Sequence, residues 1–276
     1  MKIDSHQHFW QYNAVKHSWI DDSMSVLQKD FLPADIFPHL QQNGFDGCVT
    51  VQCETSATEI TDLLQYAASN SFIKGVVGWA DFTSSDIATQ LQHYAQFPLL
   101  KGFRHVVQAE PDADFLLRAD FCNGIAQLQP YGFTYDILIY PHQFPAALKF
   151  VQRFPNQLFV IDHIAKPYIS KQTIEPWATY IKALGAFENV YCKVSGMVTE
   201  ADWHNWQPAD FTPYLDVVFG AFGTQRTMFG SDWPVCNVAG GYKDICSIPT
   251  AYLSGFSAEE QAGFWGGNAS RFYQLI

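Results

Sequence analysis

Two histidines separated by one residue, His6 and His8, stand near the start of the chain in the segment Ile3–Phe9. Side chains alternate between the two faces of a strand, so a spacing of two turns both imidazoles to the same side. Neutral imidazole is a good ligand for zinc, iron or manganese. A lone His-x-His arises often by chance, so the pair by itself predicts only half of a metal site.

Two later segments supply the groups that would complete such a site. Asp162-His163 follows a strand-like run and precedes Lys166, while Asp232 lies in Gly-Ser-Asp-Trp-Pro directly after the strand-like run Met228–Gly230. A carboxylate beside histidines or a metal ion can take a proton from water, direct the water at an ester carbonyl and return the proton to the leaving alkoxide. The chain has no Gly-x-Ser-x-Gly elbow, so the residues favour hydrolysis by activated water. The alternative for Asp232 is a helix N-cap or a turn.

Other side chains are candidates for substrate binding. Arg104, on the segment Lys101–His105, has a planar guanidinium that can clamp an oxyanion, and its alternative role is a buried ion pair. Trp10 lies beside an irregular stretch, residues 11–31, and Trp19 lies within it. Both offer a stacking surface for a sugar ring, or else they pack that loop onto the body of the protein. His105 should point away from Arg104. The lesser candidates, each with an equally good structural role, are Glu54, Lys193 and Ser195.

The elements that must position these residues alternate regularly between strands and helices. The expected strands are Ile3–Phe9, Gly47–Gln52, Ile73–Trp79, Gly102–Val106, Thr134–Leu138, Phe159–Asp162, Val190–Val194 and Met228–Gly230. Helical periodicity fills the intervals, for example Ile60–Ser69 and Ala146–Phe154. Eight such units in 276 residues predict an α/β fold, a single (β/α)8 barrel domain over residues 1–276. Loops that follow the strands of such a barrel form its active-site face.

The composition of the chain indicates which classes of partner and which cellular location to expect. With 27 acidic and 16 basic side chains the formal charge is −11, which argues against nucleic acid as a partner. No apolar run is long enough to span a bilayer, and the N-terminus lacks the pattern of a signal peptide, so we expect no membrane and a cytoplasmic protein. The six cysteines contain no Cys-x-x-Cys pair and are expected to be reduced core residues.

The chain resembles the sugar-lactonase group of the amidohydrolase superfamily, which includes L-fuconolactonase, L-rhamnono-lactonase and 2-pyrone-4,6-dicarboxylate lactonase. The most specific matches are Asp-His-Ile-Ala-Lys-Pro at 162–167 and Gly-Ser-Asp-Trp-Pro-Val at 230–235. Matches also occur at 3–10, 18–20, 30–33, 76–79, 102–105, 192–196 and 268–273, so the resemblance covers nearly the whole sequence.

This resemblance implies a hydrolase that opens a small-molecule sugar-acid lactone. Asp232 would activate water with His163, while His6, His8, His163 and Asp232 would hold a divalent ion. Independently of the resemblance, we expect Arg104, Trp10, Trp19 and Lys166 to bind substrate. Many amidohydrolases also place a histidine at the end of the fifth strand and a bridging lysine on the fourth. This chain has His142 beyond its fifth strand and Lys101 ahead of its fourth. The departures predict one ion, zinc or manganese, or none.

Two alternatives remain at this level. A metal-dependent decarboxylase of the same superfamily would share the first histidines and the final aspartate, although it would also be expected to carry the fifth-strand histidine. A barrel that binds a sugar acid without catalysis is the other. The sequence leaves open which sugar lactone is used and whether the chain forms a homo-oligomer.

Overall fold

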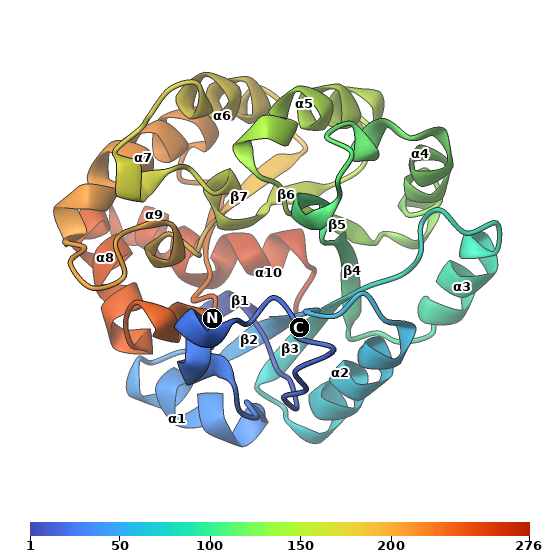
Figure 1. Cartoon of the computed structure of the whole chain (residues 1–276), viewed down its shortest axis with the longest axis horizontal. Coiled ribbons are helices and arrows are strands. Elements are labelled where there is room, and N and C mark those ends of the chain that lie inside the picture. The colour runs from blue at the N-terminus through green and yellow to red at the C-terminus, as the bar shows by residue number, and fades with distance from the viewer.

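The computed structural model describes residues 1–276 as eight parallel strands in a ring, with helices around them (Figure 1). The strands are β1 (Ile3–Gln7), β2 (Gly47–Val51), β3 (Ile73–Gly78), β4 (Leu100–His105), β5 (Thr134–Ile137), β6 (Phe159–Ile161), β7 (Val190–Val194) and β8 (Thr227–Phe229). The helices are α1 (Pro33–Gln42), α2 (Ala57–Ser69), α3 (Ile87–Tyr94), α4 (Ala119–Ile125), α5 (Phe144–Arg153), α6 (Trp177–Gly185), α7 (Pro208–Phe222), α8 (Tyr242–Tyr252), α9 (Ala258–Ala262) and α10 (Asn268–Phe272). The predicted α/β barrel is confirmed, and both ends of every predicted strand lie within two residues of the ends observed.

The barrel closes between β1 and the segment that follows β8. Consecutive strands pair in parallel from β1 to β8, and Gln7 forms a parallel bridge with Trp233. Across this seam the amide of Asp232 donates to the carbonyl of His6 at 2.8 Å, and the amide of His8 donates to the carbonyl of Trp233 at 2.7 Å. The backbone that closes the barrel is therefore the backbone that carries three of the predicted site residues.

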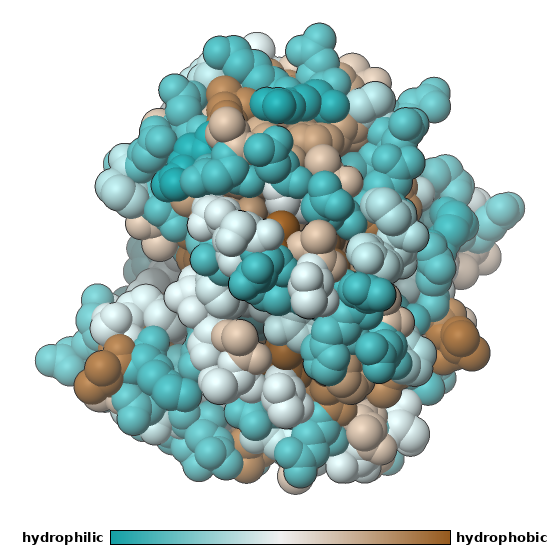
Figure 2. Space-filling model, turned by 90° about the vertical axis from the view of Figure 1, so that its right-hand side faces the viewer, coloured by the Kyte–Doolittle hydropathy of each residue, from teal (hydrophilic) through white to brown (hydrophobic).

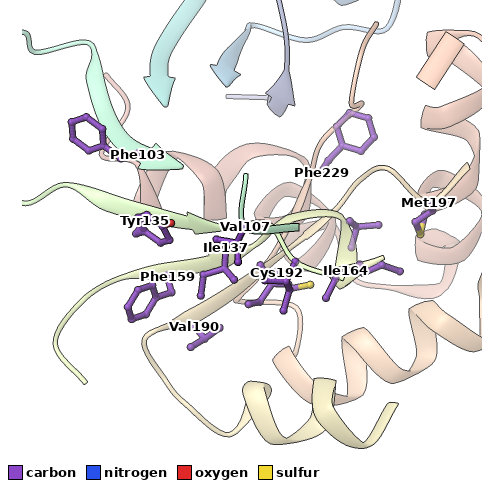
Figure 3. Packing of buried hydrophobic residues seen from close by; sticks show 14 of the residues in the cluster. Phe103, Val107, Tyr135, Ile137, Phe159, Ile164, Val190, Cys192, Met197 and Phe229 are labelled. Carbon is purple, nitrogen blue, oxygen red and sulfur yellow. The ribbon is translucent and has the colours of Figure 1, made fainter. Parts of the chain in front are cut away.

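Side-chain alternation divides the core into two parts. Sixty-seven buried residues form the larger cluster, to which β5, β6 and β7 each contribute alternate residues. Figure 3 shows part of it, with Tyr135 beside Phe159, and Ile137 between this pair and Cys192. A smaller cluster of nine residues includes Val49, Val160 and Met228 together with residues of the C-terminal segment. Its members come from the opposite face of the strands and from α10, which crosses the ring in Figure 1.

Local capping explains where two of the early helices begin. Ser56 accepts a hydrogen bond from the amide of Thr58 at the start of α2, and the carboxylate of Asp35 accepts the amide of Leu32 at 2.7 Å ahead of α1. Such caps satisfy amides that the first helical turn leaves unpaired.

The side of the molecule shown in Figure 2 is mainly hydrophilic, with apolar residues in small separate groups. None of the helices combines the length and apolar character needed to cross a membrane.

The irregular stretch after β1 is a loop closed at its base. Trp10 and Phe31 form an antiparallel bridge, with amide-to-carbonyl distances of 3.0 and 2.9 Å. The indole of Trp10 is buried, donates to the carbonyl of Lys29 at 2.9 Å and packs edge-on against Phe31. The ring of Trp10 therefore packs the loop onto the barrel, which is the alternative role given to it in the sequence analysis, whereas Trp19 is 41% exposed.

Candidate active site

The four residues of the predicted cluster meet at the carboxyl ends of the strands. His8 Nε2 lies 3.2 Å from His6 Nε2 and 3.4 Å from Asp232 Oδ1. His163 Nε2 lies 3.8 Å from the same carboxylate oxygen, and the rings of His6 and His163 have centroids 4.4 Å apart. All four side chains are at most 5% exposed. Segments more than 220 residues apart in sequence thus form one compact group.

Fixed hydrogen bonds orient two of the imidazoles. His8 Nδ1 lies 2.7 Å from the carbonyl oxygen of Val51, which can only accept, so Nδ1 carries the proton and Nε2 turns its lone pair to the cluster. His163 Nδ1 lies 2.9 Å from the hydroxyl of Ser195. The next residue, Gly196, has φ +59°, and a Cβ there would lie 2.5 Å from His163 Nδ1. Gly196 thus leaves the space that the His163 ring occupies.

Strained backbone carries His163 and Asp232 to the cluster. Residues 163–166 all have positive φ, between 48° and 56°, and Asp232 has φ 57°. These conformations cost about 1–3 kcal/mol each for residues other than glycine, and they concentrate at functional sites. The indole of Trp177 donates to the carbonyl of Ile164 at 2.7 Å and holds the turn in place. As a result His163 and Lys166 both face the cavity from a single turn.

A buried carboxylate supports the loop of Asp232. Asp4 accepts the amide of Ser231 at 2.8 Å, the hydroxyl of Ser231 at 2.6 Å and the hydroxyl of Tyr242 at 2.9 Å. Burial raises the pKa of Asp4 to about 6, against the hydrogen bonds from Ser231 and Tyr242. Asp4 therefore fastens β1 to the segment that carries Asp232.

Beneath the histidines lies a layer of paired charges. Lys193 Nζ lies 2.5 Å from Asp136, 3.0 Å from Asp162 and 3.2 Å from His6 Nδ1. Arg104 donates to Asp162 at 3.0 Å and to the side chain of Gln52. Two cations and two carboxylates balance, as buried charges require. Arg104 thus forms the buried ion pair given as its alternative, although its side chain also lines the cavity.

Burial and neighbouring charges set the protonation of the cluster. Burial lowers the pKa of His163 well below its ordinary value, against the attraction of Asp232, so the ring is neutral at neutral pH. Burial alone would raise the pKa of Asp232, but its interactions with His163, His8 and Lys166 lower it overall. A neutral imidazole thus stands beside an ionised carboxylate.

A cavity of about 860 Å³ opens above the cluster and is lined by 22 residues. His8, His163 and Asp232 form its floor, whereas His6 is fully buried behind them. The cavity is also lined by Arg104, Trp19, Lys166 and Glu54 among the candidates from the sequence. Lys193 and Ser195 act behind the histidines. His105 points away and bonds to Glu110 at 2.6 Å, as expected.

Several residues that line the cavity were missed by the sequence reasoning: Lys16, Gln108, Tyr140, Glu200 and Trp203. All of them lie in segments that follow barrel strands. That position is the only signal that could have found them, because none belongs to a short motif. Glu200 pairs with Lys166, with an N–O distance of 3.5 Å.

The donor atoms fit one divalent ion. His6, His8 and Asp232 each offer a ligand atom, and these atoms lie within 4.8 Å of one another, as do those of His6, Asp162 and His163. The lone pair of His8 Nε2 already faces the group, as ligation requires. Both groups need His6, and Asp162 is already engaged by Lys193 and Arg104. The residues therefore suit one ion better than two.

This protein is a parallel barrel, and its histidines and a carboxylate gather at the carboxyl ends of the strands. That arrangement defines the class of barrel enzymes whose active sites lie on this face. The chain belongs to the amidohydrolase family, whose model matches residues 3–275. This confirms the family resemblance found in the sequence.

Two curated relatives and one solved structure are similar over almost their whole length. The chain is 37% identical over 286 residues to the L-fucono-1,5-lactonase of Burkholderia multivorans, covering 100% of this chain and 96% of the relative. It is 34% identical over 280 residues to the L-fucono-1,5-lactonase of Burkholderia ambifaria, covering 99% and 96%. A crystal structure of an amidohydrolase from Burkholderia multivorans with bound zinc superposes with a TM-score of 0.96 at 36% identity and covers 100% of both chains.

Proposed function

We propose that this protein hydrolyses a sugar lactone, with L-fucono-1,5-lactone as the first candidate substrate. The observation that carries the proposal is the floor of the cavity, where Asp232 stands ionised among three histidines. The full-length similarity to two L-fucono-1,5-lactonases supports the choice of substrate. A cavity of about 860 Å³ can enclose a single sugar ring.

In the proposed mechanism Asp232 is the general base. Its lowered pKa keeps the carboxylate ionised at neutral pH, so it can accept a proton as water attacks the lactone carbonyl. His163 is neutral and fixed by Ser195, and it orients the reacting oxygen beside Asp232. The proton held on Asp232 then passes to the ring oxygen as the carbon–oxygen bond breaks. The product is the open sugar acid with a new hydroxyl, and its carboxyl group then releases a proton to solvent and becomes a carboxylate.

A divalent ion would be held by His6, His8 and Asp232, with His163 nearby. When bound, the ion supplies Lewis-acid polarisation and lowers the pKa of a water ligand. Zinc is the first candidate, because the similar amidohydrolase from Burkholderia multivorans contains it. Imidazole and carboxylate ligands also suit manganese.

The structure disfavours the decarboxylase alternative. The fifth strand ends at Ile137, and His142 lies beyond it in a short helical turn, exposed and outside the residues that line the cavity. No histidine from this strand therefore joins the cluster.

The cytoplasmic location and a homo-oligomeric state stay predictions from the sequence.

The experiment that tests the function is a screen of purified protein against fucono-, galactono- and rhamnono-lactones, with acid release followed by a pH indicator. We expect turnover of at least one stereoisomer well above spontaneous opening. Inert lactones together with release of carbon dioxide from an aromatic acid would instead establish the decarboxylase.

A further inference from the structure

Two lysines of the cavity wall are each held by a glutamate on a neighbouring loop. Lys166 Nζ lies 3.5 Å from Glu200 Oε1, and these side chains are 15% and 18% exposed. Lys16 Nζ lies 3.2 Å from Glu54 Oε2, with the lysine 56% and the glutamate 15% exposed. All four residues line the cavity. Each pair therefore offers a ligand in the cavity one hydrogen-bond donor, the lysine ammonium, and one acceptor, the glutamate carboxylate.

No cation in the cavity is left without a partner. Arg104, the third cation of the wall, is paired with Asp162 at 3.0 Å. Each of the three cations of the wall is therefore engaged by a carboxylate. Away from the floor, where the divalent ion would be held, a carboxylate on the substrate would meet no cation that lacks a carboxylate partner.

Both glutamates are positioned by hydrogen bonds behind them. The amide of Glu54 donates to Glu59 at 3.0 Å, and the side chain of Gln52 donates to the carbonyl of Glu54 at 3.0 Å. In the loop of Glu200, the indole of Trp203 donates to the carbonyl of Thr199 at 2.9 Å. These contacts hold the backbone of the two loops, and the ion pairs with Lys16 and Lys166 hold the carboxylates themselves.

We propose that Glu200 and Glu54 are specificity-determining residues that restrict the enzyme to uncharged polyhydroxylated lactones. They neutralise Lys166 and Lys16, so a substrate carboxylate finds no free cation. With those lysines they form donor–acceptor pairs that bind hydroxyls on neighbouring carbons of the ring. The inference rests on the proposed lactone hydrolysis.

The test compares two lactones of the same ring that differ in one charge. One is galactono-1,5-lactone, and the other is the corresponding galactaro-lactone, in which a carboxylate replaces the terminal hydroxymethyl group. We expect kcat/KM of the wild type to favour the uncharged lactone by at least about 100-fold. Glu200→Gln should reduce this preference by roughly tenfold or more, because it removes a partly buried charge and frees Lys166.

Burial ranks the variants. Glu54→Gln should change the preference less than Glu200→Gln, because Lys16 is largely exposed and its charge is screened. Glu259→Gln, an exposed glutamate of α9, is the matched control and should leave the preference unchanged. Equal turnover of the two lactones by the wild type would overturn the proposal. So would a Glu200→Gln variant that keeps the wild-type preference.

A binding measurement separates this proposal from the proposed function. If no lactone is hydrolysed, the proposed function fails, and calorimetry with the uncharged galactonolactam and the carboxylated galactaro-lactam still measures the charge preference. Tighter binding of the uncharged lactam by at least tenfold, reduced in Glu200→Gln, would support the assignment. Equal binding of the two lactams, or preference for the carboxylated one, would overturn it.

Discussion

Replacement of Gly196 by alanine tests whether the position of the His163 ring limits the reaction. The added Cβ would lie 2.5 Å from Nδ1 and 2.6 Å from Cγ of His163, whereas ordinary contact begins at 3.4 Å. The ring must then retreat by roughly 0.9 Å and lose its 2.9 Å contact with Ser195. A displacement of about 1 Å at a reacting group can cost on the order of 100-fold in rate. The positive φ of residue 196 adds about 1–2 kcal/mol of instability.

The control for this variant is Gly132→Ala, which has the backbone cost without the clash. Gly132 has φ +71°, and a Cβ there would meet no atom within 4 Å. In urea unfolding we expect Gly132→Ala to lose about 1–2 kcal/mol and Gly196→Ala to lose at least as much, because the clash adds to the backbone cost. Only Gly196→Ala should lose about 100-fold in kcat/KM on L-fucono-1,5-lactone. If Gly196→Ala keeps kcat/KM within threefold of Gly132→Ala, the ring position does not matter and the reasoning is wrong.

Three further predictions concern pH, metal and the cavity rim. Burial raises the pKa of Glu59 from 4.5 to about 7, so the folded protein binds the extra proton in this interval and stability falls as pH rises through it. Between pH 4.5 and pH 7 the wild type should lose about 3 kcal/mol more than Glu59→Gln in denaturant titrations, and parallel pH curves would contradict this. Elemental analysis after zinc loading should find at most one ion per chain and a lower content in His8→Ala, while two ions would refute the assignment of Asp162 to Lys193 and Arg104. Trp19→Ala should raise KM severalfold with little change in kcat, and an unchanged KM would remove the indole from substrate binding.

The barrel and the central cluster could be predicted because both follow from simple regularities. Eight strand–helix units allow few topologies, and the ends of parallel barrel strands converge on one face. His6, His8, His163 and Asp232 all stand at such ends, so their sequence positions were enough to place them together.

The details around the cluster depend on tertiary contacts that no local pattern encodes. The left-handed turn at 163–166 contains no glycine, and it persists because contacts such as that of Trp177 with Ile164 hold it. The sequence left two roles open for Trp10, and only the bridge with Phe31 at the base of its loop shows that the ring is buried there. Glu200 is identified as a site residue only by the fold, which places its carboxylate beside Lys166.

Hydrolysis by water activated at Asp232 is the central claim, and one measurement tests it most directly. The measurement is kcat/KM of Asp232→Asn on L-fucono-1,5-lactone, with acid release detected by a pH indicator. Circular dichroism establishes that the variant is folded. An amide cannot accept the proton of water, so we expect a fall of about 1,000-fold or more in a protein with the wild-type spectrum. Activity within tenfold of the wild type would show that another group is the base.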